Sequence, residues 1–178
     1  MKFIKQDIDG LFIVEPNLFT DERGVFRRSF CEEEFNKAGI VFNVSQGNIS
    51  ENKNKYTLRG FHYQKSPSNE SKIMTCVSGS IHNIVLDLRK DSRTYLKWVS
   101  LRIDAKNRKS IVVPAGCANA FLTLSDNTIV NYFMGDAFRQ DSYRGIRFND
   151  PHFEFDWPHQ PLFISDKDKS FPNFSDEK

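Results

Sequence analysis

The middle of the chain alternates hydrophobic and polar residues in short segments that end at turn-forming residues. In KIMTCVSGS, residues 72–80, one face would carry Ile73 and Thr75 and the other Met74 and Cys76. A period of two is the spacing of a β-strand, because successive side chains point to opposite faces. This segment is therefore predicted to be a strand that ends at a Ser-Gly-Ser turn.

The same pattern recurs as far as residue 134. Further strands are predicted within residues 81–90, 95–104, 110–116 and 128–134. No helical segment separates them, and strand after strand without an intervening helix is typical of an all-β sandwich or barrel.

One short helix is predicted near the N-terminus, in CEEEFNKAG at residues 31–39. Three glutamates in the first turn suit the positive end of a helix dipole, Ser29 is available as the N-cap, and Gly39 is a stop signal. Neither a repeat nor a linker divides the chain, so residues 1–178 are predicted to form a single domain.

Length and charge narrow the classes of partner. The 178 residues suit one hydrophobic core, and 25 basic against 23 acidic residues argue against a dedicated nucleic-acid binder. Acidic residues interrupt the apolar stretches of residues 1–16, so a signal peptide or membrane span is not expected there. We expect a cytoplasmic protein that binds neither nucleic acid nor membrane.

Few residues offer chemistry. His62, in LRGFHYQ, would share a strand face with Gly60 and Gln64, although a structural histidine is the simpler interpretation of this residue alone. No phosphate loop, nucleophile motif or dinucleotide fingerprint occurs, and no two histidines stand at a ligand spacing. A reaction without metal or other cofactor is therefore expected.

Two further side chains are candidates. Lys72 opens a predicted strand and alternates with Met74 and Cys76, beside a partly apolar face. Tyr132 shares a face with Met134, and a buried tyrosine hydroxyl needs a partner or a ligand. Solvation of the lysine and core packing of the tyrosine are the ordinary alternatives.

Four segments identify a resemblance: DERG at 21–24, LRGFHYQ at 58–64, LDLRKDS at 86–92 and VPAGCANAFLTLS at 113–125. In order and spacing they resemble the dTDP-4-dehydrorhamnose 3,5-epimerase family, and the likeness covers nearly the whole chain. The resemblance implies a cupin-type double-stranded β-helix, or jelly roll, with short peripheral helices. It also implies a homodimer in which an N-terminal strand joins the partner's sheet.

The resemblance further implies a metal-free epimerase. Such an enzyme inverts carbon 3 and/or carbon 5 of a nucleotide-linked 4-keto-6-deoxyhexose or 4-keto-heptose by proton abstraction and reprotonation through an enolate. The catalytic base would be His62, oriented and charged by Asp168, with Lys72 near the ketone and Tyr132 across the sugar ring. The family's binding positions fall on Arg23 and Arg59 at the diphosphate, on Phe26, Gln46, Asn48 and Lys167 near them, and on Asn119 at the sugar.

Departures from the family pattern leave the substrate open. Asn119 replaces a histidine and Asn83 replaces an aspartate, and both changes are expected to alter the stereochemical result or the sugar accepted. Changes near the nucleotide positions leave thymine and guanine as candidate bases, and a GDP-heptose variant of the family is one hypothesis.

Two other readings of function remain. The first is an epimerase that acts at carbon 3 only, because one protonation site can be lost while His62 remains a base. The second is a sugar-nucleotide-binding protein without turnover. An isomerase that converts 4-keto to 3-keto sugars fits the LRGFHYQ and DERG segments less well. Deuterium uptake from heavy water separates these readings.

Overall fold

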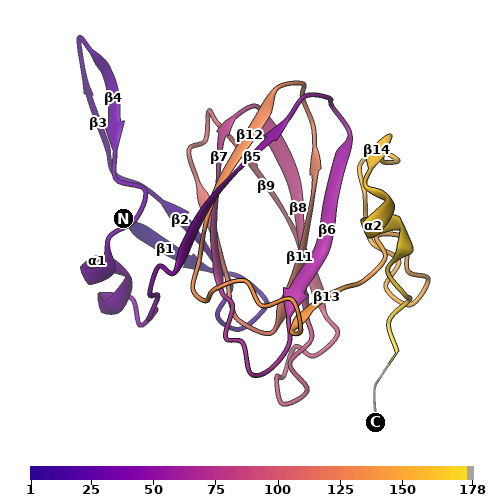
Figure 1. The fold of residues 1–178 in the computed structure, drawn as a ribbon. Coiled ribbons are helices and arrows are strands. Elements are labelled where there is room, and N and C mark those ends of the chain that lie inside the picture. Colours follow the sequence, from indigo (N-terminus) through magenta and orange to yellow (C-terminus); the bar gives the residue numbers. More distant parts are fainter. Residues whose placement is uncertain (176–178) are drawn as a thin grey trace.

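Two β-sheets face each other in the computed structural model, which describes residues 1–175 (Figure 1). The first sheet has the strand order β1 (Lys2–Lys5), β2 (Phe12–Glu15), β10 (Ser110–Val113), β7 (Lys72–Ser78), β12 (Thr128–Met134) and β5 (Gln46–Asn52). The second has the order β13 (Tyr143–Gly145), β6 (Thr57–Gln64), β11 (Cys117–Thr123), β8 (Ser80–Asp87) and β9 (Trp98–Asp104), and β14 (Phe163–Ile164) pairs parallel to β6.

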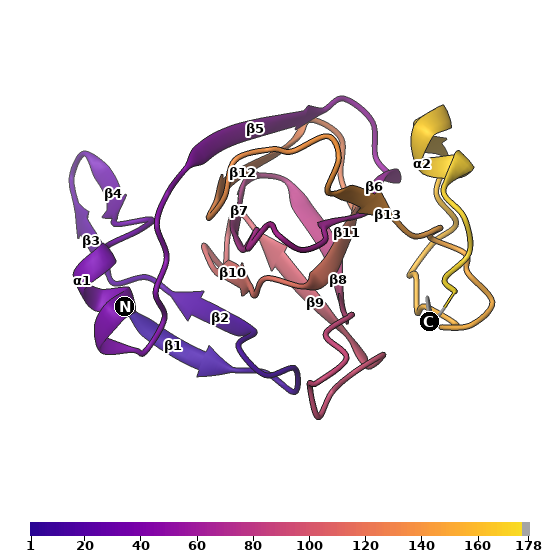
Figure 2. The ribbon, with the colours of Figure 1, turned by 60° about the horizontal axis from the view of Figure 1, so that its bottom comes forward.

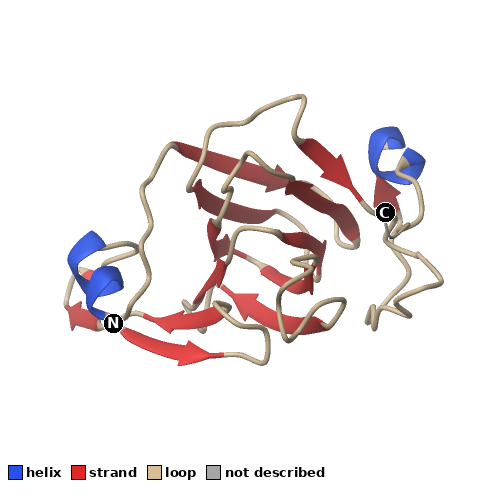
Figure 3. Ribbon diagram, turned by 90° about the horizontal axis from the view of Figure 1, so that it is seen from below, coloured by secondary structure: helices blue, strands red, loops and turns tan. Residues whose placement is uncertain are grey.

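The alternating pattern directs one apolar face of each sheet inward. Met74 and Val130 from the first sheet pack with Ile81, Val85 and Phe121 from the second in one buried cluster. Viewed along the barrel, the two sheets curve around this interior (Figures 2 and 3). Burial of these faces removes apolar area from water and holds the sheets together.

The outer faces of both sheets are also covered. The helix α1 (Glu32–Lys37) brings Phe35 against the outer side of the first sheet, where Ile73 and Val112 are buried with it. Phe153 from the C-terminal segment is buried over Phe61 of the second sheet. Strands that are buried on both faces read as nearly continuous apolar runs, as in β11.

The helix α1 begins later than its sequence suggests. Cys31 is the N-cap residue, without a side-chain hydrogen bond, so the prediction of Ser29 as the cap is wrong. Backbone N–H groups of the first turn are left uncapped there, and the glutamates of that turn supply the favourable charge instead. Gly39 follows the helix with φ +76°, a conformation that favours glycine.

A hairpin of β3 (Leu18–Asp21) and β4 (Gly24–Arg27) stands away from the two sheets (Figure 1). Its two phenylalanines are largely exposed, Phe19 by 62% and Phe26 by 70%. At the other end of the molecule in this view lies the short helix α2 (Asp166–Ser170), on the outer side of β6.

The predicted all-β jelly roll is confirmed. The strands expected from alternation are present, although residues 95–97 form a turn before β9. Residues 1–175 contain no helix that is long and apolar enough to cross a membrane.

Candidate active site

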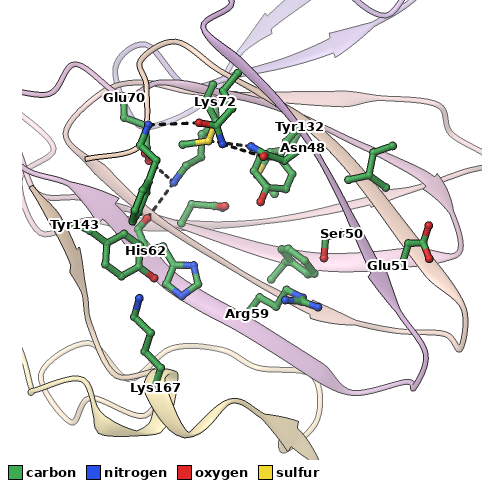
Figure 4. Close-up of a pocket in the computed structure, with 17 residues that line it drawn as sticks. Asn48, Ser50, Glu51, Arg59, His62, Glu70, Lys72, Tyr132, Tyr143 and Lys167 are labelled. Atoms are coloured by element: carbon green, nitrogen blue, oxygen red, sulfur yellow. Dashed lines mark hydrogen bonds and ion pairs between the residues drawn. The ribbon is translucent and has the colours of Figure 1, made fainter. Parts of the chain in front are cut away.

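A cavity of about 570 Å³ opens between the two sheets (Figure 4). Most of the side chains around it come from β5, β7 and β12 of the first sheet and from β6, β11 and β13 of the second, with one residue from α2 and two from loops. The lining includes eight of the predicted site residues: Gln46, Asn48, Arg59, His62, Lys72, Asn119, Tyr132 and, from α2, Lys167. One hollow thus collects side chains from opposite walls of the sandwich.

The strand β6 carries both Arg59 and His62 to this cavity. In a regular strand, residues three apart point to opposite faces. Here the register with β11 shifts, so that Asn119 lies opposite His62 and Phe121 lies opposite Arg59. Gly60 lies within the shift at φ +108°, and a Cβ atom there would come within 2.5 Å of the Asn119 carbonyl oxygen. Only glycine fits this close approach.

The His62 ring is held by a carboxylate 106 positions later in the chain. The Nε2 atom lies 2.8 Å from Oδ1 of Asp168, while Oδ2 of Asp168 accepts a hydrogen bond from the Gly60 N–H at 3.2 Å. Burial raises the pKa of Asp168, but the hydrogen bonds from His62, Gly60 and Ser165 and the charge of His62 together outweigh burial, and the pKa ends below its usual value. Ser165 caps α2 by accepting from the Asp168 N–H, which fixes this residue in the first turn.

Lys72 reaches across the sandwich from the other sheet. Its Nζ atom donates to the His62 carbonyl oxygen at 3.2 Å and lies 2.7 Å from Oε1 of Glu70. Both charged side chains are nearly buried, with 10% of Lys72 and 5% of Glu70 exposed. A buried ammonium is tolerated when such a partner compensates it.

Two tyrosines stand on opposite walls of the cavity. Tyr132 lies on β12 of the first sheet, and Tyr143 on β13 of the second lies 5.5 Å from the His62 ring. Burial raises the pKa of both hydroxyls. Lys167 places its ammonium 4.0 Å from the centre of the Tyr143 ring, a cation–π contact at the cavity edge.

Asn119 is held by two acceptors. Its Nδ2 atom donates to Oδ1 of Asn83 at 2.6 Å and to the Ile84 carbonyl oxygen at 3.2 Å. The backbone carbonyl accepts only, so it fixes which way the amide points. Oδ1 is therefore the atom of this side chain left to meet a ligand, and it can only accept a hydrogen bond. Nδ2 of Asn83 is buried and finds no hydrogen-bond partner among residues 1–175.

Two predicted binding residues lie elsewhere. Arg23 and Phe26 belong to the projecting hairpin and do not line the cavity of their own chain as the structure describes it. Arg23 pairs instead with Asp21 at the hairpin tip, with 86% of its side chain exposed. A role for these residues at this cavity therefore requires a second copy of the chain.

Two residues at this cavity, Glu70 and Tyr143, were not predicted from the sequence to have a role. Glu70 stands two positions before Lys72, and on an extended chain residues two apart point to the same face, so this spacing could have indicated that the two side chains meet. Only the structure shows that the loop before β7 buries this carboxylate at the cavity. Within residues 1–175, no three His, Cys, Asp or Glu side chains form a group that could hold a metal ion.

The fold and the cavity together define a cupin-type protein whose site is built from acid and base groups. A family model described as dTDP-4-dehydrorhamnose 3,5-epimerase matches residues 5–176. The enzyme of that name from Methanothermobacter thermautotrophicus is 37% identical over 173 residues, covering 96% of this chain and 92% of its own. This chain therefore belongs to the dTDP-4-dehydrorhamnose 3,5-epimerase family, which is a family of isomerases.

Solved structures agree with this membership. The dTDP-4-dehydrorhamnose 3,5-epimerase of Bacillus anthracis, with TDP and PPi bound, aligns with a TM-score of 0.94 at 33% identity, covering 97% of this chain and 99% of its own. A 3'-monoepimerase from Streptomyces bikiniensis in complex with dTDP-quinovose aligns with a TM-score of 0.88 at 30% identity, over 96% of this chain and 86% of its own.

Proposed function

We propose that this protein epimerises a nucleotide-linked 4-keto sugar at carbon 3 and/or carbon 5, with His62 as the catalytic base. The observation that carries the proposal is the His62–Asp168 pair, 2.8 Å between Nε2 and Oδ1, with the ring bordering a cavity that also holds Lys72. Family membership supports the substrate class, because the relatives are named as epimerases of such sugars.

The first step is removal of a proton from a carbon next to the ketone. Nε2 of His62 is engaged by Asp168, so Nδ1 is the ring nitrogen that accepts this proton. A carbon acid is far weaker than imidazolium, and each pKa unit of that gap costs about 1.4 kcal/mol. The Asp168 carboxylate reduces the cost because it stabilises the imidazolium that forms.

The negative charge then develops on the ketone oxygen. Lys72 supplies an ammonium in the same cavity, and its charge stabilises an enolate oxygen without a metal ion. Because Lys72 is fixed by protein contacts before the ligand arrives, little reorganisation is needed during the reaction.

Inversion requires a proton from the opposite face of the sugar. His62 comes from the second sheet and Tyr132 from the first, so a sugar between the sheets would have one on each side (Figure 4). The raised pKa of Tyr132 keeps its hydroxyl protonated at neutral pH, as a donor must be.

The number of inverted centres is the main alternative within this proposal. Asn119 at the cavity pairs with Asn83 behind it, and a neutral amide is too weak an acid to supply a second proton to the sugar. This favours inversion at carbon 3 alone as the competing reaction. The resemblance to a 3'-monoepimerase structure is consistent with it.

The test is deuterium uptake. The protein is incubated in heavy water with a panel of dTDP- and GDP-linked 4-keto sugars, and the products are weighed by mass spectrometry. Two deuterium atoms indicate two centres and one indicates carbon 3 or carbon 5 alone, which NMR assigns. No uptake above the enzyme-free rate with any sugar would contradict the proposal and favour a sugar-nucleotide-binding protein without turnover.

We propose deoxythymidine diphosphate as the nucleotide, because the Bacillus anthracis relative holds TDP. Arg59 at the cavity suits a diphosphate. Calorimetry should therefore give tighter binding of dTDP than of GDP. Preference for GDP would favour the guanine-linked heptose variant instead.

The cytoplasmic location stays a prediction from the sequence.

A homodimer with N-terminal strand exchange is the last part of the proposal. The strand β5 lies at the edge of its sheet and lines the cavity, and an edge strand has unpaired backbone groups that accept another strand. The N-terminal hairpin of a second copy would suit this edge, since its own Phe19 and Phe26 are exposed. Such an exchange would carry Arg23 to the partner's cavity.

A further inference from the structure

Glu70 is a buried carboxylate that borders the cavity. It lies in the loop between β6 and β7, and its residue is 7% exposed. A charged group in such a place requires compensation from neighbouring donors. Its contacts therefore indicate what it does.

One carboxylate oxygen of Glu70 fixes the ammonium of Lys72. Oε1 lies 2.7 Å from Nζ, and a second Lys72 N–H donates to the His62 carbonyl oxygen at 3.2 Å (Figure 4). An ammonium has three N–H donors. The third has no acceptor among the described residues, and Lys72 lines the cavity, so this donor is available to a ligand.

The other oxygen of Glu70 is fixed by Gln64. Its Nε2 donates to Oε2 at 2.7 Å, and its Oε1 accepts the backbone N–H of Arg139 at 2.5 Å. A backbone N–H can only donate, so it sets the orientation of the Gln64 amide. Gln64 stands two residues after His62 on β6 and points to the same side of the strand.

Both terminal atoms of the side chain at position 70 must therefore be hydrogen-bond acceptors. Both partners, the Lys72 ammonium and the Gln64 amide nitrogen, are donors. A glutamine has one acceptor and one donor, so it satisfies one partner and opposes the other.

We propose that Glu70 is a positioning residue that aims a single N–H of Lys72 at the ketone oxygen of the substrate. This inference rests on the proposed epimerase function. The carboxylate compensates the buried charge, and Gln64 couples its position to the strand that bears His62. Base and oxyanion-stabilising group are thereby held in one fixed relation, which transition-state stabilisation requires.

The experiment compares Glu70→Gln, Glu70→Asp and wild type by steady-state kinetics with the sugar nucleotide that wild type turns over. Removal of the carboxylate is expected to lower kcat by about 100-fold while KM changes little, because the lost interaction acts in the transition state. Glu70→Asp keeps both acceptors on a shorter side chain and should recover part of kcat. Glu33→Gln, which changes an exposed glutamate on α1, is the control.

Rates are expressed per folded site, counted by calorimetric titration with dTDP, and melting temperatures are recorded. Partial recovery in Glu70→Asp together with failure of Glu70→Gln supports positioning by charge. The inference is overturned if Glu70→Gln keeps the wild-type kcat, whether or not its KM rises. If Glu70→Gln does not fold, Glu70→Asp decides. Its shorter side chain displaces the ammonium of Lys72, so a kcat equal to wild type would show that this placement does not matter and would overturn the inference. Absence of turnover in wild type would instead count against the proposed function itself.

Discussion

Asp168 shows how one buried carboxylate can serve both stability and chemistry. Its pKa is lowered because contacts with His62 and the Gly60 N–H outweigh the effect of burial. A carboxyl group with a lowered folded-state pKa stabilises the fold above its unfolded pKa of about 4. This contribution is lost as pH falls through the folded-state pKa.

The Asp168→Asn variant should therefore lose activity and acid sensitivity together. An amide cannot stabilise the imidazolium of His62, so kcat is expected to fall by about 100-fold or more. The free energy of unfolding is measured by urea denaturation from about pH 3 to about pH 6, a range that spans the ordinary carboxyl pKa of about 4. It should depend less on pH in the variant than in the wild type. Unchanged kcat would contradict the role of Asp168 as the partner of the base.

The Tyr132→Phe variant separates proton removal from inversion. The hydroxyl is lost but His62 remains, so the substrate hydrogen should still exchange with solvent and return from the same face. We expect deuterium in recovered substrate by mass spectrometry and a large loss of inverted product by NMR. Inversion at the wild-type rate would show that another group donates the proton.

At the scale of elements, alternation predicted the strands better than the site. The period of two located β7 and β12 closely, and it placed Lys72 on one face with Met74 and Tyr132 on one face with Met134. It could not predict the register shift in β6, which depends on the close approach of Gly60 to β11. The pairing of His62 with Asp168 joins residues 106 positions apart, and only the family resemblance pointed to it before the structure.

The position of the helix α2 depends on a contact between Phe171, which follows it, and Gly145 of β13. Phe171 follows α2 and packs 5.9 Å from the His62 ring, and a Cβ atom at Gly145 of β13 would collide with the Phe171 ring. Glycine at this position leaves room for the ring, so the end of the helix that carries Asp168 can lie close to β6.

Gly145→Ala is therefore expected to reduce activity although the residue does not line the cavity. Displacement of Phe171 should shift Asp168 from His62 and lower kcat by about tenfold, since small misplacements of catalytic groups are costly. Gly47→Ala is the matched control, because a Cβ atom there meets only Phe133 at an ordinary 3.6 Å. Equal kinetics for the two variants would show that the contact between Phe171 and Gly145 does not position Asp168.

At the scale of the whole molecule, the single chain separates the predicted diphosphate residues. Arg59 lines the cavity, whereas Arg23 lies on the hairpin that projects from the sheets. The proposed exchange of N-terminal strands would unite them across two copies. It would also cover apolar side chains that a monomer exposes, among them Ile49 on the edge strand β5.

Sedimentation of the wild type should give twice the chain mass of 20.7 kDa.

Phe26→Asp places a charge in the proposed contact and should yield monomers with reduced turnover. Arg23→Ala should remain dimeric but bind dTDP about tenfold more weakly, the loss typical of a hydrogen bond to a charged group. A wild type that is monomeric and fully active would exclude the exchange.

The most direct measurement is hydrogen exchange by wild type and His62→Asn in heavy water, with the same 4-keto sugar nucleotide. Wild type should incorporate deuterium next to the ketone, and the variant should fall to the enzyme-free rate while calorimetry shows that it still binds dTDP. Equal exchange by the two proteins would contradict His62 as the base.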